Sequence, residues 1–262
     1  MSTTILYDNI NICDKGEGMT IQQILSPFRR AVTDYNMIEG GDKIIVGVSG
    51  GKDSLTLLTA LKAYQRFSPQ EFELMGVTID MGFKGRDERG LAAIKEYCQS
   101  IDVDFQVIPT DIAYIIFDIR KEKNPCSLCS KMRRGALCDF ARKMGFNKLA
   151  LGHHADDLIE TFLLSAFCEG RLSTFLPVSR MDRTGVTVIR PMIYLWEKDI
   201  SSFARQLPVL SNPCPANNNT KREYVKNLLK INCRDIPQAK NRLFSAIISP
   251  DRYNLYDKVK RN

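Results

Sequence analysis

The sequence lacks the features that would place it in a membrane, in an export pathway or in a disulfide framework. No apolar run approaches the roughly 20 residues that a helix needs to span a bilayer. The polar segment 1–14 does not have the pattern of a signal peptide. Internal repeats and long low-complexity stretches are absent as well. We therefore expect a cytoplasmic globular protein that does not act at a membrane.

Histidine is also sparse, and so are paired cysteines. Only 2 of the 262 residues are histidine, and the chain has a single CxxC pair among its 8 cysteines. In a reducing compartment, clustered cysteines indicate a metal or redox site more than a disulfide. Cys98, Cys138 and Cys168 lie among apolar residues at helical spacing, which predicts that they are small residues of the hydrophobic core.

The apolar pattern alternates between strands and helices. Strands are predicted over 42–49, 72–80, 105–110 and 148–152, and helices over 20–38, 55–66, 90–100, 133–144 and 157–167. This alternation predicts an α/β fold with a doubly wound parallel sheet. Beyond it we expect a strand over 187–190 and helices over 198–205 and 221–230. The domain prediction is an N-terminal helical lead-in (1–40), a core (41–170) and a C-terminal extension (171–262).

The motif SGGKDS directly follows the strongly apolar strand that begins at residue 42. Two consecutive glycines permit positive φ and remove side chains where phosphate oxygens would approach. The next helix offers free N–H groups and its positive dipole end. The loop is not GxxxxGK[ST], so a γ-phosphate kinase does not follow from it, and the alternative is an ordinary turn. The predicted nucleotide-binding residues here are Ser49, Gly50, Gly51, Lys52, Asp53 and Ser54.

A second polar motif, GHHADD, follows the strand over 148–152 and contains both histidines. In an open α/β sheet, ligands bind at the carboxyl ends of the strands. The nucleotide should therefore also lie near Val48, Asp80, Gly152 and His153. Asp156 and Asp157 are candidates for Mg²⁺ binding or proton transfer, and one of them is expected to cap the following helix instead.

The CxxC pair consists of Cys126 and Cys129, and Cys214 lies far downstream in the sequence NPCP. A lone CxxC is compatible with half of a zinc site, a redox pair or two ligands of an iron–sulfur cluster. A structural zinc site needs four ligands, and no second CxxC is present. Three cysteines without a fourth suit a [4Fe–4S] cluster in which one iron is open to another ligand.

Positive charge is concentrated in two segments of a chain with a formal net charge of +7. The first comprises Lys121, Lys123, Lys131, Arg133, Arg134, Arg142 and Lys143, and the second Lys221, Arg222, Lys226 and Lys230. Basic segments beside candidate chemistry favour a nucleic-acid partner. The alternative for each is a solvated helix face.

The loop resembles the S-G-G-x-D-S signature of the PP-loop superfamily, and GHHADD resembles the G-H-[HN]-x-D-D motif of its members that act on tRNA. The resemblance implies that ATP is cleaved between the α and β phosphates and that AMP is passed to an oxygen. It also implies that Asp53 helps to hold Mg²⁺, a role suited to a hard carboxylate oxygen.

Six stretches together resemble the tRNA 2-thiocytidine biosynthesis (TtcA-like) family of PP-loop ATP-pyrophosphatases. They are GVSGGKDS, PCSLCSKMRRG, ALGHHADD, VIRPMIY, EKDI and NPC, in the family's order over about residues 20–250. The resemblance implies that Cys126, Cys129 and Cys214 bind a [4Fe–4S] cluster. Family members have a further cysteine shortly after the last of these, but residues 216–219 here contain none.

The resemblance implies an ATP-dependent tRNA sulfurtransferase. ATP would bind the loop, with Mg²⁺ held by Asp53 and one of the two aspartates, and the C2 oxygen of an anticodon-loop cytidine would be adenylated and then replaced by sulfur. Arg133 matches a basic residue that related thiolases use near the nucleotide. The implied partners are tRNA, a sulfur donor (a cysteine desulfurase or sulfide) and a second copy of the chain in a homodimer.

Three alternatives remain open at this point. Related PP-loop enzymes attack the activated base with an amine instead of sulfur, and such an enzyme needs no CxxC. Others thiolate uridine, although those carry terminal zinc-binding CxxC pairs that this sequence lacks. The third alternative is an iron–sulfur or redox protein in which the nucleotide loop has no catalytic role.

Overall fold

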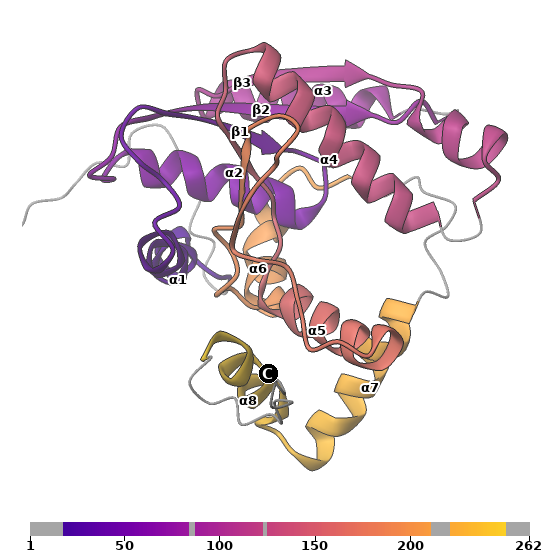
Figure 1. Ribbon diagram of the computed structural model, residues 1–262. Coiled ribbons are helices and arrows are strands. Elements are labelled where there is room, and N and C mark those ends of the chain that lie inside the picture. The colour runs from indigo at the N-terminus through magenta and orange to yellow at the C-terminus, as the bar shows by residue number, and fades with distance from the viewer. Residues whose placement is uncertain (1–17, 84–86, 123–124, 211–220, 250–262) are drawn as a thin grey trace, which may run out of the picture. The chain divides into compact units, whose positions relative to one another are not determined.

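The computed structural model describes residues 18–83, 87–122, 125–210 and 221–249 (Figure 1). The chain divides into two compact units, Met1–His154 with Leu176–Ala216 and Ala155–Phe175 with Asn217–Asn262. Among the described residues, no helix has both the length and the apolar character needed to cross a membrane. The three-part domain division expected from the sequence stays a prediction.

A six-stranded sheet forms the centre of the first unit, with the strand order β3-β2-β1-β4-β6-β5. The strands are β1 (Asp42–Gly47), β2 (Phe72–Asp80), β3 (Asp104–Pro109), β4 (Lys148–Ala150), β5 (Val178–Arg180) and β6 (Thr187–Ile189). Every neighbouring pair is parallel except β5 and β6. The predicted α/β parallel sheet is therefore confirmed. Because the chain winds one way from β1 and the other way from β4, the switch point lies between these two strands.

Helices pack on both faces of this sheet (Figure 1). On one face, α4 (Pro125–Lys143) and the π-helix η1 (Tyr114–Ile119) share a core with inward side chains of the strands, among them Ile45, Val77 and Leu149. On the other, α2 (Lys52–Gln65) packs on β1 and β2, and α1 (Ile21–Asp34) packs on α2. Both faces are covered, which explains why β1 is a continuous apolar run.

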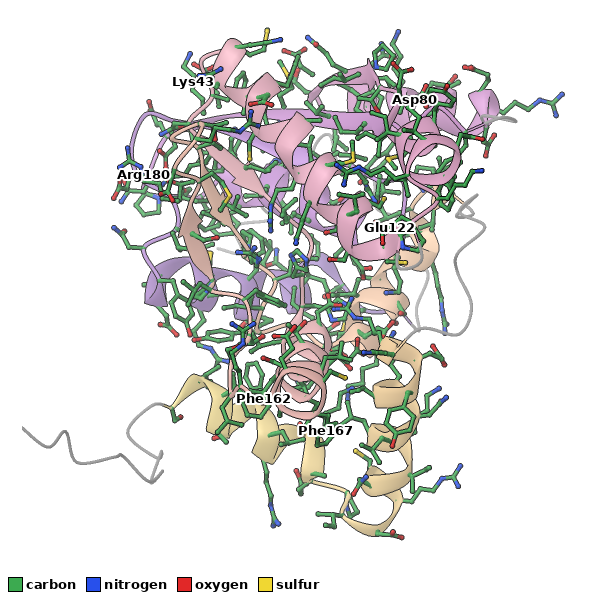
Figure 2. All side chains as sticks on the ribbon, turned by 45° about the vertical axis from the view of Figure 1, so that its right-hand side comes forward. Lys43, Asp80, Glu122, Phe162, Phe167 and Arg180 are labelled. Atoms are coloured by element: carbon green, nitrogen blue, oxygen red, sulfur yellow. The ribbon has the colours of Figure 1, made fainter. Side chains whose placement is uncertain are left out.

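The remaining helices of the first unit are short or lie at the edge of the sheet. They are α3 (Glu88–Ser100), α6 (Glu197–Phe203) and the 3-10 helix η2 (Ala204–Gln206). In Figure 2, Lys43 marks the beginning of β1, and Asp80 marks the carboxyl end of its neighbour β2. These two labels show the direction of the parallel strands, and the polar motifs follow the ends of β1 and β4.

The second unit consists of α5 (Ala155–Glu169), α7 (Lys221–Asp235) and α8 (Ala239–Ile248), which pack on one another. α5 is apolar on more than one side, and Figure 2 labels Phe162 and Phe167 on it. From α7, Val225 and Leu229 are buried. Thus α5, although it directly follows β4 in the chain, belongs to a small helical unit with the C-terminal helices.

Two of the three cysteines predicted for the core lie there, and the third does not. Cys98 and Cys138 are buried. Burial raises the pKa of the Cys98 thiol to about 12 and also raises the pKa of Cys138. The prediction for Cys168 was wrong, because this residue is exposed near the end of α5. Apolar residues lie on more than one side of α5, and only one part of the helix surface faces the core.

Candidate functional site

The SGGKDS loop folds around the hydroxyl groups of its two serines. The backbone N–H of Ser49 donates a hydrogen bond to Ser54 Oγ at 3.1 Å, and Ser54 Oγ donates to the Gly51 carbonyl at 2.9 Å. Gly50 has a φ of 82°, which favours glycine, and an added Cβ there would come within 2.9 Å of Leu210. These contacts fix a tight backbone loop immediately after β1.

The helix after the loop supplies the charge that the sequence predicts for a phosphate site. Gly51 is the N-cap of α2 without a side-chain cap, and Lys52 and Asp53 lie in the first turn. The first backbone N–H groups of a helix have no partner within the helix, and they carry the positive end of its dipole. The loop can therefore accept a phosphate oxygen, while Lys52 supplies a further positive charge.

The end of β4 comes very close to this loop. A Cβ added to Gly152 would lie 3.1 Å from the carbonyl carbon and oxygen of Asp53 and 3.3 Å from the Ser54 nitrogen. Since these are backbone atoms, only glycine fits without displacing the loop. The structure thus gives a reason for Gly152 in the predicted nucleotide site, and places it beside the phosphate loop.

The carboxyl ends of β1 and β2 are joined by a side chain. Thr78 Oγ1 donates a hydrogen bond to the Val48 carbonyl at 2.6 Å. Asp80 accepts a hydrogen bond from the Gly82 N–H at 3.0 Å. Val48 therefore borders the loop directly, whereas the contact of Asp80 organises the turn that follows β2.

A histidine contacts the loop's carboxylate. His154 is buried, and its Nε2 lies 3.7 Å from Asp53 Oδ1. His153, the histidine that the sequence analysis chose for the nucleotide site, is half-buried. The sequence pattern GHH did not show which of the two turns toward Asp53, since both follow the same short strand.

Glu197 also belongs to this site, although it was not among the site residues predicted from the sequence. Its Oε1 lies 3.3 Å from Lys52 Nζ, and the same ammonium is 2.8 Å from Asp53 Oδ1. Burial alone would lower the pKa of Lys52, but the hydrogen bond and charge of Asp53 and the charge of Glu197 outweigh it and raise the pKa. The available signal was the stretch EKDI, which contributed to the family resemblance.

The CxxC pair lies in the first turns of α4, where Pro125 is the first helical residue. Cys126 is exposed and Cys129 is partly buried. Cys126, Cys129 and Arg133 follow one another at helical spacings of three and four, so they share one face of the helix. The two thiols and the guanidinium group are thus carried on the same side of α4.

This arrangement fits two of the ligands of a cluster. Thiolates one turn apart at a helix N-terminus are favoured by its dipole, and their negative charge would be offset by Arg133. Cys214 lies outside the described residues. Within residues 18–83, 87–122, 125–210 and 221–249, no group of three His, Cys, Asp or Glu side chains is placed to hold a metal ion.

In the second unit, the acidic residues of α5 are paired with basic residues of the C-terminal helices. Asp156 forms an ion pair with Lys240 of α8. Arg222 of α7 lies 3.4 Å from both Asp157 and Glu160. The Asp156 and Glu160 side chains are only 5% and 3% exposed, and that of Asp157 is 17% exposed. The assignment of Asp156 and Asp157 to the reaction stays a prediction.

The same contacts divide the second basic segment. Arg222 and Lys226 turn toward α5, where Lys226 Nζ lies 3.8 Å from Glu160. Lys221 and Lys230 are exposed. Hence α7 supplies counter-charges for the carboxylates of α5. Only the rest of the positive charge in this segment lies outside these ion pairs.

Comparison with known proteins agrees with this geometry. A family model described as the PP-loop domain matches residues 20–233. A tRNA-cytidine(32) 2-sulfurtransferase of Geobacter metallireducens is 41% identical over 239 residues, with 87% of this chain and 90% of that protein covered. The tRNA-cytidine(32) 2-sulfurtransferase of Teredinibacter turnerae is 38% identical over 229 residues, with 85% of this chain and 75% of that protein covered.

A solved structure shares the fold. The U34-tRNA thiolase NcsA from Methanococcus maripaludis, determined with its [4Fe-4S] cluster, matches with a TM-score of 0.74 over 92% of this chain and 83% of its own. Its sequence identity of 20% makes this likeness evidence for the fold alone. The sequence relatives have higher identity and similar length. Together with the loop, they confirm the expected membership: the chain belongs to the PP-loop family, in the branch of the tRNA-cytidine(32) 2-sulfurtransferases.

Proposed function

We propose that this protein is an ATP-dependent tRNA sulfurtransferase that replaces the C2 oxygen of a cytidine in the anticodon-loop region with sulfur. The observation that carries the proposal is the phosphate loop at the sheet's switch point, in a chain that is about 40% identical to cytidine enzymes over nearly its whole length. Cytidine is favoured over uridine because the relatives at this level of identity are named for cytidine.

ATP binds at residues 49–54, with its phosphates against the N–H groups at the start of α2 and the charge of Lys52. The C2 oxygen of the base attacks the α-phosphorus, and pyrophosphate leaves. This step turns a poor leaving group into AMP. Sulfur then forms a bond to C2, and AMP departs with the former C2 oxygen. A base in a loop can be turned out of its stack to reach such a site.

Asp53 is the proposed ligand for the Mg²⁺ that accompanies ATP. Its carboxylate is a hard oxygen donor, its side chain is 35% exposed, and Lys52 and His154 contact its Oδ1. A metal ion can replace either of these groups at the Asp53 carboxylate. The buried and doubly paired Glu160 in the second unit lacks this accessibility.

Cys126, Cys129 and Cys214 are the proposed ligands of a [4Fe–4S] cluster. When bound, such a cluster supplies an iron that is open to a sulfur ligand. Arg133 shares the helix face of the two described cysteines, where it offsets negative charge and orients the anionic groups that reach this surface. Cytoplasmic localisation, a homodimer and a sulfur donor such as a cysteine desulfurase or sulfide belong to the same proposal.

Mass spectrometry of nucleosides tests the proposal. Transfer RNA is isolated from three strains and digested to nucleosides. One strain has the intact gene, one lacks it, and one has a copy that encodes Lys52→Met. We expect 2-thiocytidine only in cells with the intact gene. Retention of 2-thiocytidine in the deletion strain contradicts the proposal, and loss of 2-thiouridine instead assigns the enzyme to uridine. An iron-free preparation that still forms 2-thiocytidine contradicts the role of the cysteines.

A further inference from the structure

The ammonium group of Lys52 lies between two carboxylates from distant parts of the sequence. Asp53 is its neighbour in the chain and contacts it at 2.8 Å, whereas Glu197 comes from α6 and contacts it at 3.3 Å. The side chains of the three residues are between 29% and 35% exposed. They therefore form one small charged group on the border of the phosphate loop.

The fold sets the position of Glu197 independently of Lys52. Glu197 is the first residue of α6, directly after its N-cap Trp196. A carboxylate is favoured there by the helix dipole. Ile200 and Phe203 of the same short helix are buried, and α6 packs on α2. The carboxylate of Glu197 is thus held beside the first turn of α2 by the packing of α6.

The two carboxylates differ in what else they contact. Asp53 Oδ1 also lies 3.7 Å from His154, and Asp53 is the proposed metal ligand. A carboxylate that takes up Mg²⁺ attracts an ammonium group less strongly, because the two cations repel each other. Glu197 is on a different helix and can keep its contact with Lys52 when Asp53 changes partners.

We propose that Glu197 is a positioning residue for ATP binding, which keeps the Lys52 side chain directed over the phosphate loop while Asp53 exchanges Lys52 for the metal ion. Glu197 acts through Lys52 and does not contact the nucleotide. The inference rests on the ATP-binding part of the proposed function and adds a residue to it.

Direct binding of ATP to the intact protein, with and without Mg²⁺, tests the role of Glu197. We expect Glu197→Gln to raise the Kd for ATP about 5- to 10-fold, as for the loss of a charged hydrogen-bonding partner. Glu197→Asp should restore part of the affinity. The matched control is Glu73→Gln, which removes the exposed pair with Lys43, 2.8 Å apart in the same unit, and should leave the Kd unchanged.

A double-mutant cycle shows whether Glu197 acts through Lys52. In a Lys52→Met background, Glu197→Gln should have little further effect on the Kd, because the residue it positions is gone. A full additional effect in that background overturns the proposal, as does an unchanged Kd in the single variant. In steady state we expect the KM for ATP to rise while the KM for tRNA stays constant.

Two further outcomes separate this inference from its alternatives. If Glu197→Gln lowers the Tm and raises the KM for ATP and tRNA alike, its role is structural and the proposal is wrong. The wild-type protein could bind ATP, and Glu197→Gln could weaken that binding, while no 2-thiocytidine is formed. In that case the proposed function fails and the positioning role stands. ATP binding and nucleoside formation are thus independent readouts.

Discussion

The two units of the chain use the same kinds of charged residue in opposite ways. At the phosphate loop, Lys52, Asp53 and Glu197 are each about one-third exposed, and Lys52 contacts both carboxylates. In the second unit, Asp156 and Glu160 are almost fully buried and are paired with cations of α7 and α8. An accessible ion pair is screened by water and costs little to rearrange, whereas a buried carboxylate that loses its partner is costly.

This difference separates groups that can exchange partners with a ligand from groups that hold helices together. Lys52 can exchange its ion pair for a phosphate group, and Asp53 can exchange its ion pair for a metal ion. The α5 carboxylates already have counter-charges within their own unit, and the predicted part of Asp156 and Asp157 in the reaction stays a prediction. Substitutions at the loop should therefore impair ligand binding, and substitutions in the second unit should lower stability.

The largest effect is expected for Asp53→Asn, which keeps the shape of the side chain but removes the charge. We expect formation of 2-thiocytidine to fall roughly 100-fold or more, with little change in Tm, because the carboxylate serves the ligand. Single-turnover assays with purified protein and tRNA measure the rate. Asp102→Asn, which removes the exposed pair with Lys62, is the control. Normal activity of the Asp53 variant would place the metal elsewhere.

Glu160→Gln should act on stability instead. Loss of the charge leaves Arg222 and Lys226 without their buried partner, and we expect the free energy of unfolding to fall by roughly 1–3 kcal/mol. Denaturant unfolding gives this value, and ATP binding should change less than about 2-fold. An unchanged stability combined with lost ATP binding would show that the α5 carboxylates serve the nucleotide and would break the comparison.

Gly152→Ala tests the close approach of β4 to the loop. The new Cβ would lie 3.1 Å from backbone atoms of Asp53, which cannot move without shifting the loop. We expect the Kd for ATP to rise about 10-fold, equivalent to about 1.4 kcal/mol. Gly40→Ala is the control, since its Cβ would be 3.8 Å from a flexible glutamine side chain. Equal affinities of the two variants for ATP would contradict the proposal that the phosphates bind at the loop formed by residues 49–54.

The smallest effect is expected at the exposed pair of Lys43 and Glu73. Their side chains are 45% and 61% exposed, so we expect Glu73→Gln to change the free energy of unfolding by less than about 0.5 kcal/mol. Unfolding curves at low and high salt should then coincide with those of the wild type. A larger loss in the free energy of unfolding would show that the exposure of an ion pair does not indicate its contribution to stability in this protein.

The sequence predicted the sheet because β1 and β2 are strong apolar runs bounded by polar motifs. It missed α8 and the π-helix, whose short apolar patterns lack clear boundaries. It also started the helix after the cysteine pair at residue 133, although the helix begins at Pro125. Cys126 and Cys129 are therefore on a helix, where their spacing places both thiols on one face.

For the site, the sequence identified the residues of the loop but not their partners. Glu197 and His154 are brought to Lys52 and Asp53 by tertiary packing, and local patterns carry no information on such contacts. The pairing of Asp156 with Lys240 depends on a helix that the sequence did not predict. Local motifs thus revealed the chemistry, while the neighbours that adjust charge came from the fold.

The central claim is that the C2 oxygen of the base is adenylated and leaves with AMP. Transfer RNA carrying ¹⁸O at C2 of the target cytidine tests it most directly. After reaction with unlabelled ATP, Mg²⁺ and a sulfur donor in anaerobic buffer, mass spectrometry of AMP should find one ¹⁸O atom for each 2-thiocytidine formed. Unlabelled AMP, with 2-thiocytidine present, would contradict the account.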